Sequence, residues 1–292
     1  MAESSLSSSG VRWPQPLCCV AALVGTFAVN CTEYEPASDT LEFTGIAGNG
    51  NVVASTAPLG QDWSCLDRPV QQVSAPVFAG SAPQVIYSLQ MVDLSSGAIY
   101  RNLRVRACAL TDVNCANPLT NMLGVNEQGR VDVPLFQNFT GYLEITSTEL
   151  VPQIFYVNEP LQPRTQPDFP LAMLSLSSLG PLAQLLGANI APDTGFIGIR
   201  IFDCQGDTAS GVTLLSDNDA VPWYLVDGLP STQASATGQE GLAGFMNVPP
   251  GLAVVRAVAP DGTEIGLQSM VVRPGWMSSM YVRPPGVQTA AP

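Results

Sequence analysis

Residues 245–255 read Phe-Met-Asn-Val-Pro-Pro-Gly-Leu-Ala-Val-Val and carry the clearest structural signal in the chain. Apolar residues stand on both sides of a Val-Pro-Pro-Gly corner. Proline fits such a corner because an edge position needs no backbone donor, and Gly241 at the preceding turn can adopt a positive φ. The pattern predicts two short β-strands that meet at a tight corner.

The same order of turn, strand, corner and strand occurs earlier in the chain. Residues 126–134 read Asn-Glu-Gln-Gly-Arg-Val-Asp-Val-Pro, and residues 141–145 read Gly-Tyr-Leu-Glu-Ile. The two copies lie about 100 residues apart, a spacing typical of duplicated domains rather than of a short-period solenoid. The repeat therefore predicts two domains of similar fold.

Alternation of apolar and polar residues places these domains at 84–158 and 195–284. The first range holds about six or seven short strands, the number typical of a small β-sandwich. One face of its first strand is apolar, at Val85, Tyr87, Leu89 and Met91. The predicted fold class is all-β, with two β-sandwich domains.

The segments outside the two domains have a different composition. Residues 31–83 are polar and rich in small residues, and predict a tether with some strand. Residues 159–194 predict a proline-rich linker and a short helix, because four prolines in the linker favour an extended chain and leucines from Leu171 to Leu186 then follow helical spacing. We expect the helix to break at Gly180-Pro181 and to end at Gly187. Residues 285–292 predict a disordered tail.

Over about 195–283 the chain resembles the carboxypeptidase regulatory-like family of transthyretin-like (prealbumin-like) β-sandwiches. The family's opening strand, Asp-x-x-Gly turn and Gly-Val strand match residues 199–206 (Ile-Arg-Ile-Phe-Asp-Cys-Gln-Gly) and Gly211-Val212. Its later turn and Asn-Val-Pro-Pro-Gly corner match residues 237–241, where Gly238 replaces the usual Asp, and residues 247–251. The resemblance implies a structural or binding module of a bacterial secreted or lipoprotein-type chain, without an active site of its own.

The N-terminal residues 1–30 predict a signal peptide. The apolar run from Leu17 to Val29 is 13 residues long, follows Arg12 and precedes a polar, acidic stretch. A membrane-spanning helix needs about 20 apolar residues, whereas the apolar part of a secretory signal has about 7 to 15. Export is therefore the prediction, and a buried strand of a cytosolic domain is the alternative.

Cys31 directly follows this run and resembles the lipidated cysteine of a bacterial lipoprotein. Cleavage after Ala28, without a lipid, is the alternative. The chain has seven cysteines. Loss of Cys18 and Cys19 with the signal leaves five, and a lipid on Cys31 leaves four, an even number that suits pairing in an oxidising compartment.

The four cysteines left are predicted to form disulfides. Cys108 and Cys115 have six residues between them, an interval that suits a hairpin returning on itself. Cys65 and Cys204 are then left to pair by elimination, a pairing that spacing alone does not decide.

The charge composition excludes several classes of function. Lys+Arg is 11, His is 0 and the formal net charge is −13, and every basic residue is an arginine. Without histidine and lysine there is no histidine base or metal ligand, no Schiff-base lysine and no P-loop lysine. Nucleic-acid binding needs clustered cations, and only Arg101, Arg104 and Arg106 stand close together, where we interpret them as solvated protection of a strand edge.

Candidate binding residues are few. Loop aromatics are candidate ligand contacts, at Trp63, Trp223, Tyr224 and Trp276. The acidic region that includes Asp217 and Asp219 has oxygen ligands of the kind that calcium prefers, but it lacks the order of an EF-hand loop, so we expect a solvated loop and no metal.

Catalytic residues are not predicted. Glu127, Glu144 and Glu240 would be candidates for a hydrolase that uses carboxylates alone, but two of them lie in turns of the repeat. Asp193-Thr194-Gly195 spells the aspartic-protease triplet, yet a second triplet is missing and a turn is the preferred interpretation.

Together these observations predict a non-catalytic structural or binding protein of the cell envelope, lipid-anchored at Cys31. We expect it at the outer membrane or cell surface, or otherwise in the periplasm or secreted. The expected partners are other envelope proteins or glycans, with no cofactor, no nucleic acid and no membrane contact except through the lipid. The alternatives are a surface receptor for carbohydrates or peptides and the carboxylate-only hydrolase.

Overall fold

The computed structural model describes residues 61–66, 83–137, 139–158, 161, 164–165 and 170–284. All of them belong to the compact unit Leu41–Pro292. The predicted signal peptide, the lipidation site Cys31, most of the predicted tether and the predicted tail lie outside the described residues. Below, the first half means the described residues in 83–173, and the second half means residues 195–284.

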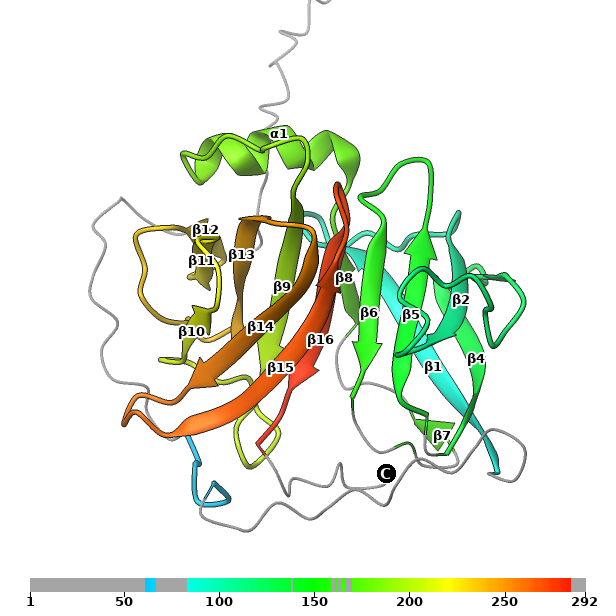
Figure 1. Ribbon diagram of the computed structural model, residues 1–292, viewed down its shortest axis with the longest axis horizontal. Helices are drawn as coiled ribbons and strands as arrows, with labels where there is room; N and C mark the ends of the chain where they lie inside the picture. Colours follow the sequence, from blue (N-terminus) through cyan, green and yellow to red (C-terminus); the bar gives the residue numbers. More distant parts are fainter. Residues whose placement is uncertain are drawn as a thin grey trace, which may run out of the picture. The chain divides into compact units, whose positions relative to one another are not determined.

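The described residues form strands, apart from one helix, as the alternation predicted (Figure 1). The first half contains β1 (Gln84–Asp93), β2 (Arg104–Ala109), β3 (Leu123–Gly124), β4 (Arg130–Phe136), β5 (Gly141–Thr146), β6 (Gln153–Val157), β7 (Arg164–Thr165) and β8 (Leu171–Met173). Helix α1 (Leu176–Leu185) follows. The second half contains β9 (Gly195–Ile201), β10 (Thr213–Ser216), β11 (Val221–Val226), β12 (Leu229–Ser231), β13 (Leu242–Val248), β14 (Gly251–Val258), β15 (Glu264–Val272) and β16 (Met277–Val282).

These strands form three sheets. The largest has nine strands in the order β12-β11-β13-β9-β16-β6-β5-β2-β3. A four-stranded sheet has the order β4-β1-β7, with β8 also paired to β1, and a three-stranded sheet has the order β10-β14-β15. The corner predicted at 248–251 joins β13 to β14, which lie in different sheets, and Gly251 there has a φ of +126°.

The nine-stranded sheet contains strands of both predicted sandwiches. The C-terminal strand β16 pairs in parallel with β6 of the first half and with β9 of the second half. Residues 159–194 therefore do not separate two independent sheets, although they do connect the two predicted ranges. Local alternation predicts that a segment is a strand, but it does not say which strands become neighbours, so this pairing was not foreseen.

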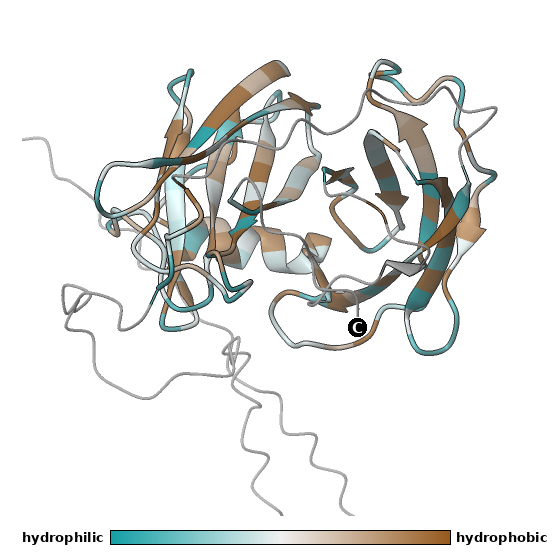
Figure 2. Ribbon diagram, turned by 90° about the horizontal axis from the view of Figure 1, so that it is seen from below, coloured by the Kyte–Doolittle hydropathy of each residue, from teal (hydrophilic) through white to brown (hydrophobic). Residues whose placement is uncertain are grey.

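Three apolar cores pack against the nine-stranded sheet. Hydrophobic and hydrophilic residues alternate along several strands (Figure 2). The first-half core fills the space toward β1 and β4 and includes Tyr87, Val133, Leu143 and Phe155. The second-half core fills the space toward β14 and β15 and includes Ile197, Ile199, Val255 and Met270. The helix core lies beneath α1 and includes Leu174, Leu186, Phe196 and Trp223.

The predicted linker and helix differ from the structure in two ways. The predicted linker contains β7, and the leucine-patterned segment predicted as helix begins with β8; both strands pair in parallel with β1. Proline removes a donor only at its own position, so residues between prolines can still join a ladder. The helix begins at Leu176, after Leu171–Met173 has formed β8, because Ser175 caps it by accepting a hydrogen bond from the Ser178 N–H.

The helix also continues through Gly180-Pro181, where we expected a break. A residue before proline is normally pushed out of the helical region partly by its own Cβ, and Gly180 has none. The expected end is present. Gly187 has a φ of +62°, its N–H donates to the Gln184 carbonyl, and the Ala188 N–H donates to the Ala183 carbonyl, which is the Schellman pattern.

Candidate functional site

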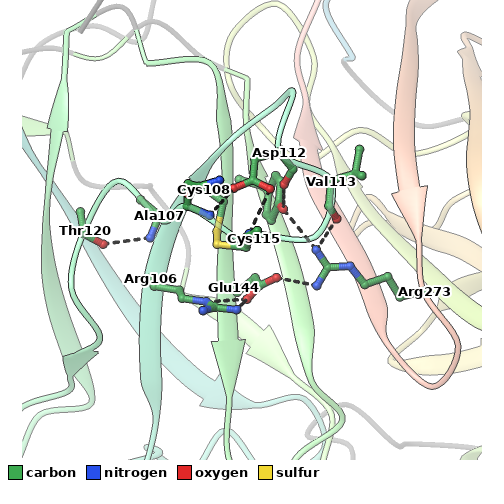
Figure 3. The surroundings of a disulfide bond; sticks show 12 residues. Arg106, Ala107, Cys108, Asp112, Val113, Cys115, Thr120, Glu144 and Arg273 are labelled. Carbon is green, nitrogen blue, oxygen red and sulfur yellow. Dashed lines mark hydrogen bonds and ion pairs between the residues drawn. A yellow bond between two sulfur atoms is a disulfide. The ribbon is translucent and has the colours of Figure 1, made fainter. Parts of the chain in front are cut away.

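A buried polar cluster surrounds Glu144 on β5. Its side chain is 2% exposed and forms ion pairs with two arginines. Arg106 stands directly opposite on β2, and its Nε donates to Glu144 Oε2 at 2.7 Å. Arg273 lies in the turn between β15 and β16, and its Nη1 donates to Glu144 Oε1 (Figure 3). One carboxylate therefore ties the first half to the second.

Arg273 makes further contacts at the same place. Its Nη2 donates to the Val113 carbonyl and lies 3.1 Å from the Tyr142 hydroxyl. The guanidinium also lies over the Trp276 ring, 4.9 Å from its centroid. Burial raises the pKa of Tyr142, although the nearby Arg273 charge opposes that shift. Tyr142 therefore stays protonated at neutral pH and donates its own hydrogen bond to the Asp112 carbonyl.

The Cys108–Cys115 disulfide holds the loop that receives Arg273. The two Cα atoms are 5.3 Å apart, and both cysteines are buried. The Asp112 carboxylate accepts hydrogen bonds from the backbone N–H groups of Asn117 and Ala116, and these bonds hold its pKa below the ordinary value. The loop conformation is thus fixed by one covalent bond and by its own hydrogen bonds.

The second disulfide joins Cys65 to Cys204, two residues separated by 139 positions, with their Cα atoms 5.8 Å apart. It attaches segment 61–66, which precedes the first half in sequence, to the second half. The buried Asp203 carboxylate accepts from the Asp62 N–H, and the Cys204 N–H donates to the Asp62 carbonyl. Although segment 61–66 precedes the first half in sequence, these contacts attach it to the second half.

A metal site is not supported by the chemistry of these residues. Among the described residues, Cys108, Cys115 and Glu144 are a group of three whose ligand atoms lie within 4.8 Å of one another. The two sulfurs are bonded to each other, and both carboxylate oxygens already accept from guanidinium groups. The group therefore offers no free anionic ligand to a cation.

The acidic region weighed for calcium makes hydrogen bonds to backbone N–H groups. Asp217 Oδ1 accepts from the Val254 N–H, and Asn218 Oδ1 accepts from the Ala220 N–H. Asp219 is exposed. In the part of the chain that the structure describes, no three carboxylates gather there as a metal-ligand group.

The candidate aromatic residues do not form a surface platform. Trp223 is 8% exposed and belongs to the helix core, and Tyr224 is 2% exposed in the second-half core. Trp63 and Trp276 are partly buried against that same second-half core. A ligand role for these four residues stays a prediction, and the exposed coplanar arrangement that would favour it is not seen for them.

The candidate carboxylates lie in different parts of the structure, each with different surroundings. Glu127 is exposed in the turn before β4, and Glu240 accepts a hydrogen bond from the Gly228 N–H. Asp193 is exposed in a turn that Thr194 closes by donating to the Ala191 carbonyl. Glu144 is engaged with two arginines, one on each carboxylate oxygen.

Sequence reasoning missed the ion-pair cluster. It interpreted Arg106 as a solvated edge cation, whereas Arg106 pairs with the buried Glu144. The alternation of β2 and β5 places both side chains on predictable faces, but the register that sets them opposite each other was not deducible. No local signal marked Arg273, which stands in a turn.

No known protein family matches the chain, and no curated protein matches it. Among solved structures, the shaft pilin SpaA of Lactobacillus rhamnosus GG is 9% identical, with a TM-score of 0.24, covering 70% of this chain and 100% of the pilin chain. A streptococcal ancillary pilin is 10% identical, with a TM-score of 0.24, covering 69% and 63%. The major pilin subunit BcpA of Bacillus cereus is 8% identical, with a TM-score of 0.23, covering 69% and 70%. TM-scores this low carry no conclusion about function.

The part of the chain that the structure describes has no helix long and apolar enough to cross a membrane. The resemblance to the carboxypeptidase regulatory-like family stays a prediction, since no family match accompanies it.

Proposed function

We propose that this chain is exported and acts as a non-catalytic structural protein of the cell envelope. The observation that carries the proposal is the Cys65–Cys204 disulfide, which links segments 139 positions apart. Disulfides persist in oxidising compartments and are rare in the cytosol, where thiols are kept reduced. Such a bond constrains the unfolded chain strongly, because it closes a long loop.

The use of the charged residues supports a structural role. The buried carboxylates Glu144 and Asp203 are saturated by arginines or backbone N–H groups. Groups arranged in this way stabilise contacts between segments, whereas a catalytic acid or base needs a proton that it can exchange with a substrate. The proposal therefore assigns these residues to holding the molecule together.

The proposed attachment is through Cys31, with an acyl group on a mature chain that begins there. Cleavage after Ala28 would instead release the protein into the periplasm or the medium. The partners that we propose are other envelope proteins. The net charge of −13 does not favour electrostatic attraction to anionic lipid headgroups, so a covalent lipid would have to supply the attachment.

Fractionation of the source cells, followed by intact mass measurement and N-terminal sequencing of this chain, tests the proposal. We expect an envelope fraction with a mature chain that starts at Cys31 and carries acyl mass. A start at Val29 without acyl mass keeps export but removes the anchor. A chain that begins at Met1 in the soluble fraction would refute export.

A further inference from the structure

The C-terminal strand β16 occupies the centre of the nine-stranded sheet. Residues 277–282 pair with residues 196–201 of β9, and residues 277–280 pair with residues 153–156 of β6 (Figure 1). In the strand order of this sheet, β16 lies between β6 and β9. Without β16, β9 would still pair with β13 and β6 with β5, but each half would end at a strand with one open edge.

The side chains of β16 enter the cores of both halves. Met280 and Val282 belong to the second-half core, and Tyr281 belongs to the first-half core. The Tyr281 ring packs edge-on against Phe155 of β6, with ring centroids 5.1 Å apart, and against Phe202 at 5.6 Å. This one strand thus contributes apolar area to two cores.

Polar contacts, of which the Gln153–Ser279 pair is buried, fix the position of β16. Gln153 Nε2 on β6 donates to Ser279 Oγ, and both residues are buried. Asn158 Nδ2 donates to the Tyr281 carbonyl at 2.9 Å, and Ser278 Oγ donates to the Val271 carbonyl at 2.7 Å. Buried polar groups are costly unless they are paired, so a shifted or absent β16 would leave several of them unsatisfied.

The strands on either side of β16 cannot easily tolerate its absence. All five residues of β6 are buried, and six of the seven residues of β9 are buried. An open edge that consists of buried apolar residues exposes both its backbone groups and its side chains, which favours aggregation over an isolated folded half. The ion pair between Arg273 and Glu144 adds a further link beside the same junction.

From these contacts we infer that the two halves fold and unfold as one cooperative unit, which β16 closes. Neither half is complete until residues 277–282 are in place, so stable folding follows the arrival of the C-terminal strand. Folding of the two halves through β16 takes place in the same way wherever the protein resides.

Hydrogen exchange of the full-length, disulfide-bonded chain tests the inference, with amides of β5 and β13 as probes of the two halves. Val133→Ala removes two buried methyl groups of β4 from the first-half core. Val255→Ala removes two buried methyl groups of β14 from the second-half core. We expect each variant to lower the protection of both sets of amides by the same factor, at least about tenfold. Leu252→Ala, at a 68% exposed position, is the control that should change neither set.

The opposite result is a loss of hydrogen-exchange protection that is confined to the half carrying the substitution. If Val133→Ala lowers protection in β5 alone and Val255→Ala lowers it in β13 alone, the halves are independent and the inference is overturned. Tyr281→Ala extends the test to β16 and should lower both sets equally. If that variant does not fold, the Val133 and Val255 variants still decide the question.

Discussion

Glu144 is the residue on which the polar contacts between the two halves converge. A buried carboxylate is stable only when its charge is paired and its oxygens accept hydrogen bonds, and here each oxygen has its own arginine. Replacement of Glu144 is therefore expected to destabilise the protein. Removal of the carboxylate would leave two guanidinium groups facing each other without an anion.

Glu144→Gln should therefore destabilise the protein by about 3 kcal/mol, near the lower end of the range for breaking a buried ion pair, because Arg106 is partly exposed to water. The measurement is the free energy of unfolding in urea. Glu127→Gln makes the same change in an exposed turn and should alter this value by less than about 0.5 kcal/mol. Equal stability of the two variants would show that the ion-pair cluster contributes little.

Asp93 is a residue whose ionised form the fold favours. Its burial opposes ionisation, but hydrogen bonds from Ser95, Tyr100 and Ser96 outweigh that effect, and its pKa lies below the ordinary value of 3.8. A lowered folded pKa means that the stabilisation is fully present above about pH 4 and is lost as the pH falls through the folded pKa.

The wild-type protein should therefore lose stability more steeply below about pH 4 than Asp93→Asn does. Unfolding in urea at a series of pH values checks this, and Asp219→Asn is the matched control at an exposed aspartate without a hydrogen bond of this kind. The control should keep the wild-type slope. Parallel curves for the wild type and Asp93→Asn would contradict the assigned role.

At the scale of elements, sequence patterns predicted much of the first half. The alternation Val85, Tyr87, Leu89, Met91 marks the buried face of β1, and all four side chains are buried. The Gly187 helix end was also predictable, because few residues other than glycine accept a positive φ. By contrast, β8 was interpreted as helix, since leucine spacing in a short segment fits both a strand and a helix.

Substitution at Gly187 tests the helix end. Its φ of +62° is unfavourable for residues with a Cβ, so Gly187→Ala should destabilise the protein by about 1 kcal/mol. Gly187→Asn should cost less, because asparagine tolerates this conformation better than alanine does. Thermal unfolding of the two variants gives the comparison. An alanine variant at least as stable as the asparagine variant would contradict the assignment.

At the scale of the whole molecule, the sequence indicated an all-β chain with disulfides, but it did not indicate which strands and residues of the two halves contact each other. The arrangement depends on contacts between residues far apart in sequence: β16 with β6, Arg273 with Glu144, and Cys65 with Cys204. The spacing of residues along the sequence does not tell which distant segments become neighbours in the fold. The ion-pair cluster could not be predicted for the same reason. Alternation does not give the register that sets Arg106 opposite Glu144, and it does not indicate the approach of Arg273.

The two disulfides should differ in their contributions to stability. Loop-closure entropy predicts a loss of about 4 to 5 kcal/mol when Cys65 and Cys204 are both replaced by serine, and about 2 to 3 kcal/mol for Cys108 and Cys115, which close a much shorter loop. Unfolding in urea of the two double variants provides the values. A larger loss for the Cys108 and Cys115 variant would show that the loop contacts with Arg273, rather than chain entropy, dominate.

The state of the cysteines inside the source cells tests the proposed function most directly. Cells are treated with a membrane-permeant alkylating reagent, the chain is denatured and reduced, and a second reagent labels the cysteines that were protected. We expect Cys65, Cys108, Cys115 and Cys204 to carry only the second label. The first label on all four of them, in a chain recovered from the cytosol, would contradict the account of an exported protein held together by disulfides.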